Sequence, residues 1–165
     1  MPSDNIEIIH AISADAVAVA AIHRASRAHA MPWLPVVHTP DEDVEYFQKE
    51  VLPTQTVYLA LKAGLPIGFI AFTQTWLNHL YLDPAHLRVG LGSKLLSFAK
   101  AETQSLNLWT FQKNQPARAF YLRHNFLEVE FTDGASNEEK TPDVRMVWIA
   151  YPQSAPFGGN TVPRS

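Results

Sequence analysis

The chain has 165 residues and no cysteine, with 47% hydrophobic residues, 18% charged residues and a formal net charge of −3 at neutral pH. This balance is typical of one globular domain and excludes wholesale disorder. The lack of cysteine excludes disulfides, thiolate metal sites and a cysteine nucleophile, and the slightly acidic charge argues against a generic nucleic-acid or anionic-membrane binder.

The ends of the chain and its apolar stretches favour a cytoplasmic protein. Residues 1–10 are polar and mixed, without the apolar core of a signal peptide. No apolar run approaches the ~20 residues that a membrane span needs, because Asp15 interrupts the most apolar stretch. Residues 151–165 contain three prolines and the pair Gly158–Gly159, which is typical of a loose tail. We expect a single domain over residues 1–150 followed by a flexible C-terminal tail.

The first quarter of the chain predicts a strand and two helices. Residues 6–9 are typical of a short strand, and Ser13 predicts the cap of a helix that continues to about Ala28. A loop rich in proline and aromatic residues follows at 29–38. The second helix should begin at a capping box with proline at the first helical position, formed by Thr39, Pro40 and Glu42.

A run of strands comes next. Residues 56–61 and 67–73 are rich in β-forming residues and flank the turn Ala63-Gly64-Leu65-Pro66, which is typical of a hairpin. A third strand is expected at 76–82, where Asp83-Pro84 ends it. Early hairpins favour an antiparallel arrangement.

The second half predicts a strand–helix–strand crossover. Apolar spacing indicates a helix over residues 91–104, Asn114 can cap a second one, and Asn125 is placed to end it in the left-handed conformation. The remaining strands are expected at 106–111, 126–131 and 144–149. The predicted order βααβββαβαββ implies a mixed sheet with helices on its faces.

The strongest chemical signal is a glycine turn between the third strand and the following helix. Gly90 and Gly92 let the backbone approach a ligand, and the helix start offers unpaired N–H groups, an arrangement suited to a phosphate or pyrophosphate. Arg88 and Lys94 can add charge at the rim. Leu95 stands where a dinucleotide fingerprint needs a third glycine, and the spacing before Lys94 does not fit a Walker A loop. A coenzyme A pyrophosphate site and an ordinary tight turn both remain open.

Two segments, in the correct order, resemble the cofactor motifs of the GNAT superfamily of N-acetyltransferases. Residues 88–96, Arg-Val-Gly-Leu-Gly-Ser-Lys-Leu-Leu, follow Leu-Tyr-Leu-Asp-Pro at 80–84 and resemble the acetyl-CoA signature. Residues 108–126 resemble the second cofactor segment. The resemblance covers about 56–149, with two departures. Leu87 stands where the family usually has Gln or Arg, and Asn125 stands where glycine usually follows the helix.

The resemblance implies an α/β fold with a mixed, mostly antiparallel central sheet flanked by helices (the GNAT fold), in which two strands splay apart at the cofactor. It implies acetyl-CoA as a co-substrate, with the pantetheine arm between the splayed strands, the pyrophosphate on backbone amides after the glycine turn, and no metal. The cofactor-binding residues that it implies are Leu80, Tyr81, Leu82, Arg88, Val89, Gly90, Leu91, Gly92, Ser93, Asn114 and Arg118.

The resemblance further implies direct acetyl transfer to a primary amine. Tyr121 matches the family's tyrosine that protonates the departing thiolate. A phenol with a pKa near ~10 can donate that proton, although a tyrosine here could also serve only to pack its ring in the core. The base is not fixed. His79, with an ordinary pKa near ~6.5, is one candidate. Glu138 in the acidic loop 132–143 is the other, and Glu139 is expected to be a solvated turn residue.

The acceptor is expected near the loop 31–38. Trp33 and His38 are the candidate substrate residues, although the same loop could simply cover one end of the sheet. The predicted function is an N-acetyltransferase acting on a small-molecule or peptide amine, with no nucleic-acid or membrane partner; the sequence is compatible with a homodimer. The alternative is an acyl-CoA-binding module or sensor without transferase activity.

Overall fold

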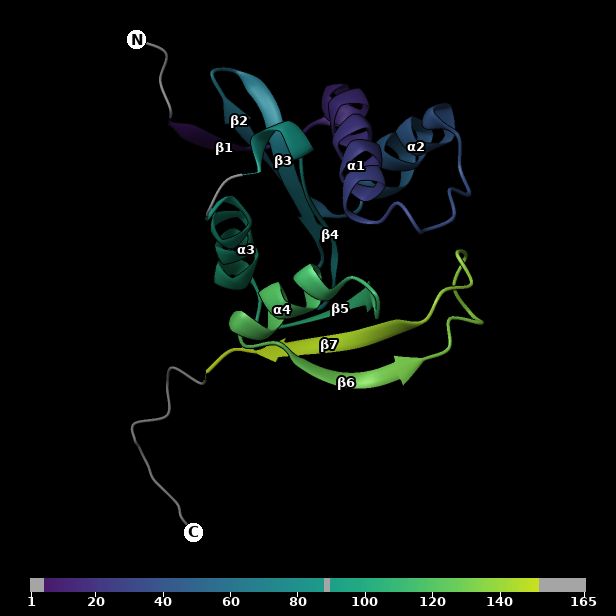
Figure 1. Ribbon diagram of the computed structural model, residues 1–165. Coiled ribbons are helices and arrows are strands. Elements are labelled where there is room, and N and C mark those ends of the chain that lie inside the picture. The colour runs from purple at the N-terminus through teal and green to yellow at the C-terminus, as the bar shows by residue number, and fades with distance from the viewer. Residues whose placement is uncertain (1–4, 88–89, 152–165) are drawn as a thin grey trace.

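The computed structural model describes residues 5–87 and 90–151, and its elements follow the predicted order (Figure 1). Arg88, Val89 and all but the first residue of the predicted tail lie outside the described residues. The strands are β1 (Ile6–His10), β2 (Thr56–Lys62), β3 (Leu65–Phe72), β4 (Leu77–Leu82), β5 (Ser105–Phe111), β6 (Leu127–Thr132) and β7 (Asp143–Ile149). The helices are α1 (Ala16–Ala30), α2 (Pro40–Tyr46), α3 (Leu91–Glu102) and α4 (Gln115–Arg123).

The ends of the helices confirm most of the predicted caps. Thr39 Oγ1 accepts the Glu42 N–H at 3.2 Å, and the Glu42 carboxylate accepts the Thr39 N–H at 2.8 Å, which completes the capping box of α2. Asn125 ends α4 with φ +70°. Ser13 does not cap α1. A 3₁₀ turn over Ser13–Asp15 precedes that helix instead, because the Asp15 carboxylate reaches back to the Ile12 N–H at 2.8 Å.

The β2–β3 hairpin is tighter than predicted. Its turn consists of Ala63 and Gly64 alone, both at positive φ (51° and 78°), which matches the twist of a two-residue hairpin. Leu65 and Pro66, expected in the turn, already pair with β2, with Leu65 opposite Lys62.

The strands form two antiparallel sheets, ordered β1-β2-β3-β4 and β5-β7-β6. In the described part of the chain, one parallel bridge, Trp76 to Asn107, joins them, and the Asn107 N–H donates to the Thr75 carbonyl at 2.8 Å. Past this bridge the described residues of β4 pair only with β3, and those of β5 only with β7. The two parallel neighbours β4 and β5 therefore separate, which confirms the predicted mixed sheet with splayed strands.

Two hydrophobic layers hold the first sheet. Phe69 and Leu59 face α1 and the π-helical turn Phe47–Val51, whereas the alternate residues, such as Ile70, face α3. Figure 1 shows α1 and α2 on one side of this sheet and α3 on the other. Among the described residues, no helix combines the length and apolar character needed to cross a membrane.

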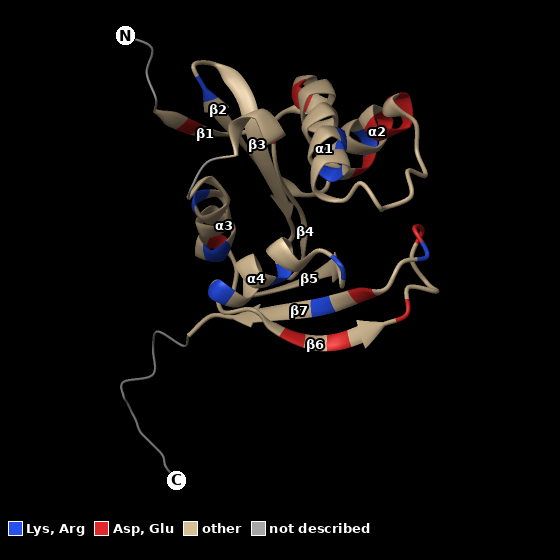
Figure 2. Ribbon diagram, in the orientation of Figure 1, with Lys and Arg blue, Asp and Glu red and all other residues tan. Residues whose placement is uncertain are grey.

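The charged residues are unevenly placed. Acidic residues on α2 and in the loop 133–142 between β6 and β7 lie on the same side of the molecule (Figure 2). This side is also where β4 and β5 have separated.

Candidate active site

A narrow slot of about 90 Å³ lies between the separated strands. Its walls come from β4, β5 and the start of α4, together with one residue that follows α1. The lining residues are Met31, Leu77, Asn78, His79, Leu80, Tyr81, Leu108, Trp109, Thr110, Phe111, Asn114, Ala117 and Tyr121. Of the predicted cofactor residues, the structure thus brings Leu80, Tyr81 and Asn114 to this slot.

The glycine turn stands at the start of α3. Gly90 has φ +91° and is the N-cap, and the first intrahelical bond is donated by the Lys94 N–H to the Gly90 carbonyl at 2.9 Å. The N–H groups of residues 91–93 precede that bond and point out of the helix start. At Gly92 a Cβ would lie 3.3 Å from the Phe120 ring, so α3 and α4 approach closely here. Leu91 buries its side chain in the core, which leaves only its backbone for a ligand.

Tyr121 is held in the slot by its ring. It packs edge-on against Phe120 and Phe126, with centroids 5.2 and 5.4 Å apart. Burial raises the pKa of the Tyr121 phenol, and the nearby Tyr81 raises it further. The hydroxyl therefore keeps its proton at neutral pH and can donate it.

Three of the predicted cofactor residues already have protein partners. The Arg118 guanidinium donates to the Glu128 carboxylate at 2.6 Å and to the Gln112 carbonyl at 2.9 Å. Ser93 Oγ lies 2.9 Å from His124 Nε2, and Asn114 Oδ1 accepts the Ala117 N–H at 3.3 Å. These contacts fasten α4 in place, so a role for the Arg118 side chain at the cofactor stays a prediction.

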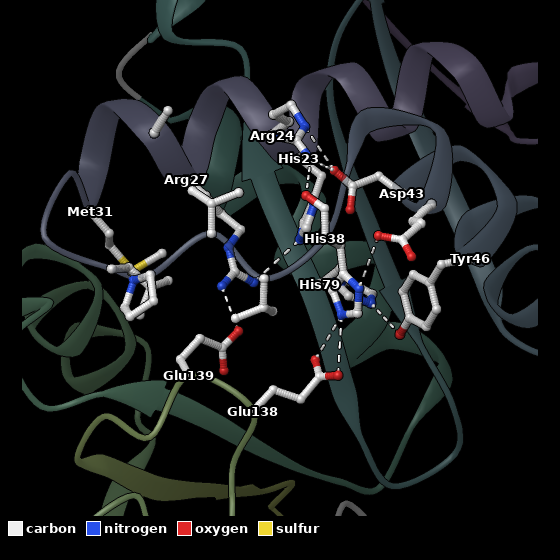
Figure 3. Close-up of a pocket in the computed structure, with 16 residues that line it drawn as sticks. His23, Arg24, Arg27, Met31, His38, Asp43, Tyr46, His79, Glu138 and Glu139 are labelled. Atoms are coloured by element: carbon white, nitrogen blue, oxygen red, sulfur yellow. Dashed lines mark hydrogen bonds and ion pairs between the residues drawn. The ribbon is translucent and has the colours of Figure 1, made fainter.

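A larger cavity of about 450 Å³ opens beside the slot (Figure 3). It lies between α1, the loop after α1, α2 and the loop 133–142. The lining residues are His23, Arg24, Arg27, Ala28, Met31, Leu34, Pro35, Val36, Val37, His38, Glu42, Asp43, Tyr46, His79, Glu138 and Glu139. Two of these, Met31 and His79, also line the slot. The slot and the cavity therefore meet at these two side chains.

Two arginines of α1, one turn apart, cross the cavity to carboxylates. Arg24 pairs with Asp43 at 2.9 Å and also donates to the His38 carbonyl at 2.6 Å. Arg27 pairs with Glu139 at 2.9 Å, and the Glu139 side chain is only 12% exposed. The expectation that Glu139 is a solvated turn residue is therefore wrong, because Arg27 draws its carboxylate inward.

The mouth of the cavity carries a second group of charges. His38 Nε2 lies 3.1 Å from the Glu138 carboxylate, and its Nδ1 lies 3.8 Å from Glu42. The hydrogen bond to Glu138 raises the pKa of His38. Glu138 itself is 67% exposed in its side chain and does not line the slot. Its position suits the binding of a charged ligand better than proton transfer at the thioester.

His79 stands at the junction of the two cavities. Its Nε2 lies 3.3 Å from the Tyr46 hydroxyl, and its Nδ1 is buried without a partner among the described residues. Burial lowers the pKa of His79 to about 4, and the positive charge of Arg27 contributes to this shift. The imidazole is thus neutral at pH 7 and has a lone pair to accept a proton.

Three residues around this junction were not predicted from the sequence: His23, Arg27 and Tyr46. His23 packs edge-on against His79 and Tyr81, with centroids 5.7 and 4.9 Å apart. Burial lowers the pKa of His23 to about 2, and His79 contributes to this shift. The only signal in the sequence was the spacing of His23 and Arg27, four residues apart on one face of a predicted helix; Tyr46 gave none.

Trp33 is not among the residues that line the cavity, so its role in acceptor binding stays a prediction. Its ring packs edge-on against Phe111, with centroids 6.3 Å apart, and Lys113 Nζ lies 4.8 Å above it. The apolar wall of the cavity is formed by Met31, Leu34, Val36 and Val37. His38, the other predicted substrate residue, does line it. No group of three or more His, Asp or Glu residues in the described part of the chain is arranged to hold a metal ion.

Comparison with known proteins relates part of the chain to a family. Residues 53–128, just under half of the chain, match the family model of the acetyltransferase (GNAT) domain. A curated relative, the uncharacterized N-acetyltransferase YafP of Escherichia coli (strain K12), is 30% identical over 83 residues. That match spans 50% of this chain and 53% of the relative, or about half of the length of each.

Solved structures share the fold over nearly the whole chain. Apo YjaB from Escherichia coli has a TM-score of 0.72 at 18% identity and covers 89% of this chain and 99% of its own. PaiA N-acetyltransferase from Thermoplasma acidophilum, in complex with coenzyme A, has a TM-score of 0.70 at 20% identity. The match covers 88% of this chain and 99% of PaiA. YncA from Salmonella typhimurium, solved with acetyl-CoA, has a TM-score of 0.68 at 20% identity. The match covers 91% of this chain and 99% of YncA.

Gly134 lies in the loop 133–142, which forms one wall of the cavity. It has φ +81°, and a Cβ there would lie 2.2 Å from the Thr141 backbone. We expect Gly134→Ala to lower the free energy of unfolding by about 2 kcal/mol or more and to raise the KM for the acceptor, because the loop also carries Glu139. Gly64→Ala is the matched control, since Gly64 has a similar φ of +78° but nothing within 4 Å. Equal losses in denaturant titrations of both variants would contradict this reading.

Proposed function

We propose that this protein is a single-domain enzyme over residues 1–150 that transfers an acetyl group from acetyl-CoA to a primary amine. The observation that carries the proposal is the meeting of a narrow slot and a larger cavity at His79 and Met31. A slot between splayed strands suits an extended thioester arm, and the larger cavity suits the acceptor. Two reactants that enter from different sides would meet at one point.

The residues around the slot fit acetyl-CoA. The outer edge of β4 at Leu80–Leu82 offers backbone groups that no described strand pairs with, and the N–H groups at the start of α3 suit a pyrophosphate. Coenzyme A or acetyl-CoA is bound in two of the solved structures with this fold, PaiA and YncA. The thioester supplies an activated acyl carbon, and the chain supplies its placement and the proton transfers.

The transfer needs one proton acceptor and one proton donor. As the amine nitrogen attacks the thioester carbonyl, a C–N bond forms, the C–S bond breaks, and the nitrogen must lose a proton. In the tautomer in which His79 Nε2–H donates to the Tyr46 hydroxyl, Nδ1 keeps its lone pair and would take that proton. Tyr121, which keeps its proton because burial raises its pKa, would donate to the departing thiolate.

His79→Gln tests the base. We expect kcat/KM for the amine to fall about 100-fold, in the range typical of a lost general base, with little change in acetyl-CoA binding. Because the pKa of His79 is lowered to about 4, the wild-type pH profile should show no loss of activity through this group between pH 7 and pH 5. Tyr46→Phe, which removes only the hydroxyl beside His79 Nε2, should lower kcat/KM less than His79→Gln does. Activity that falls with the ordinary histidine pKa, near ~6.5, would contradict the assignment.

The proposed function itself is tested by coupling two readouts. Calorimetry with coenzyme A measures binding, and thiol release from acetyl-CoA with a panel of amines, followed by mass spectrometry of the acetylated amine, measures transfer. Binding with amine-dependent release of thiol is the expected result. Binding without release for every amine would support an acyl-CoA-binding module instead, and the absence of binding would overturn both readings.

A further inference from the structure

The charges around the larger cavity do not balance. Among the described residues, four carboxylates but only two guanidinium groups line it. Both guanidiniums form ion pairs at 2.9 Å, Arg24 with Asp43 and Arg27 with Glu139, and within each pair the positive and negative charges cancel. The excess negative charge therefore belongs to the remaining two carboxylates, Glu42 and Glu138. Even a protonated His38 between them leaves one negative charge over.

The position of this excess charge relative to His79 suggests how a ligand would lie. Figure 3 shows Glu138 reaching towards His38 from the loop 133–142, across the cavity from α1. Both excess carboxylates are well exposed, with 58% for Glu42 and 67% for Glu138, whereas the unpartnered Nδ1 of His79 is buried among the described residues. Apolar side chains line the same cavity, among them Met31, Leu34, Val36 and Val37. The cavity thus combines a buried proton acceptor, apolar walls and an acidic mouth.

We propose, on the basis of the function proposed above, that the acceptor is an aliphatic diamine or longer polyamine, whose far ammonium group is held by Glu138 and Glu42 while its near amine reacts beside His79. Only the reacting nitrogen must be neutral, so a second cation can keep its charge at the mouth. The methylene chain between the two nitrogens suits the apolar walls. This assigns Glu138 to acceptor binding and not to catalysis.

An amino-acid acceptor fits the cavity less well. A carboxylate on the ligand would need a free guanidinium, and both arginines already bind carboxylates of the chain. It would also be repelled by Glu138 and Glu42 at the mouth. A monoamine would be accepted but would leave the acidic mouth without a partner.

Three acceptors with four carbon atoms each separate these possibilities. Butylamine, 1,4-diaminobutane and 4-aminobutanoate end at the far side in a neutral methyl group, a cationic ammonium group and an anionic carboxylate, respectively. We expect kcat/KM to be highest for the diamine and lowest for the amino acid, with about a fivefold gap between diamine and monoamine. Equal values for diamine and butylamine, or a preference for 4-aminobutanoate, would overturn the diamine proposal while leaving acetyl transfer intact. Turnover of other amines but of none of these or of longer polyamines would also overturn the diamine proposal, whereas turnover of no amine in the panel would count against the proposed function.

A variant pair tests the role of Glu138. We expect Glu138→Gln to reduce the preference for 1,4-diaminobutane over butylamine about threefold, and high salt to do the same in the wild type, because the interaction is exposed and screened. Glu45→Gln is the matched control. It also removes one negative charge, but Glu45 lies on α2, pairs with Lys49 and does not line the cavity. A loss in Glu138→Gln that is equal for both amines would mean that Glu138 only holds the loop to His38.

Discussion

Tyr121→Phe should lower kcat for acetyl transfer about 100-fold or more, with little change in the KM for acetyl-CoA. The substitution keeps the ring that packs against Phe120 and Phe126 and removes only the hydroxyl. Without that donor the thiolate must leave unprotonated or wait for water, and a positioned acid is typically worth about 10²–10⁴ in rate. Because burial raises the pKa of this phenol, activity should not fall at mildly alkaline pH through its ionisation.

The control for this variant is another tyrosine in the same core. Tyr58→Phe also removes one hydroxyl, which donates to the Glu102 carboxylate away from the slot, and it should leave kcat within about twofold. Pre-steady-state measurement of thiol release shows whether the chemical step is the one affected. If chemistry limits turnover and Tyr121→Phe keeps its full rate, the thiolate is protonated by another group.

Acid should destabilise this protein strongly, through the histidines at the junction of the two cavities. In the unfolded chain each histidine binds a proton with its ordinary pKa of 6.5, but burial lowers the folded-state pKa of His79 to about 4 and that of His23 to about 2. Between pH 6.5 and 4 the unfolded state therefore binds more protons, and the free energy of unfolding falls as the pH falls. His79 alone should account for about 3 kcal/mol by pH 4.

Denaturant titrations at pH 7, 5.5 and 4 measure this effect. His79→Leu should flatten the decline relative to the wild type, because leucine binds no proton in either state. His29→Gln, which changes an exposed histidine at the end of α1, should leave the decline as it is. His38 works in the opposite direction, since its pKa is raised in the folded state and its ion pairs are strongest when it is protonated. An identical pH dependence for the wild type and His79→Leu would refute the assignment.

Local signals predicted the elements well, because their causes are local. The capping box at Thr39, the N-cap at Asn114 and the left-handed Asn125 each depend on residues within a few positions, and all are confirmed. The start of α1 was misplaced because Ser13 lies inside a 3₁₀ turn, in which the Asp15 carboxylate accepts the Ile12 N–H, and the α-helix begins only after that turn. The exact length of the hairpin turn was also not predicted, because Pro66 belongs to the strand and not to the turn.

The sequence by itself determined the order of elements, the glycine turn before α3 and the resemblance of its two motifs to the GNAT family, since these depend on spacing along one segment. Only the tertiary structure decided which side chains share the acceptor cavity. Arg27 and Glu139 are 112 residues apart, and His38 and Glu138 are 100 residues apart, so no local pattern relates them. Their meeting depends on how far β4 and β5 separate and how the loop 133–142 folds back towards α1. It is packing between distant elements that drew Glu139 inward, brought Trp33 against Phe111 and placed His79 where the two cavities join.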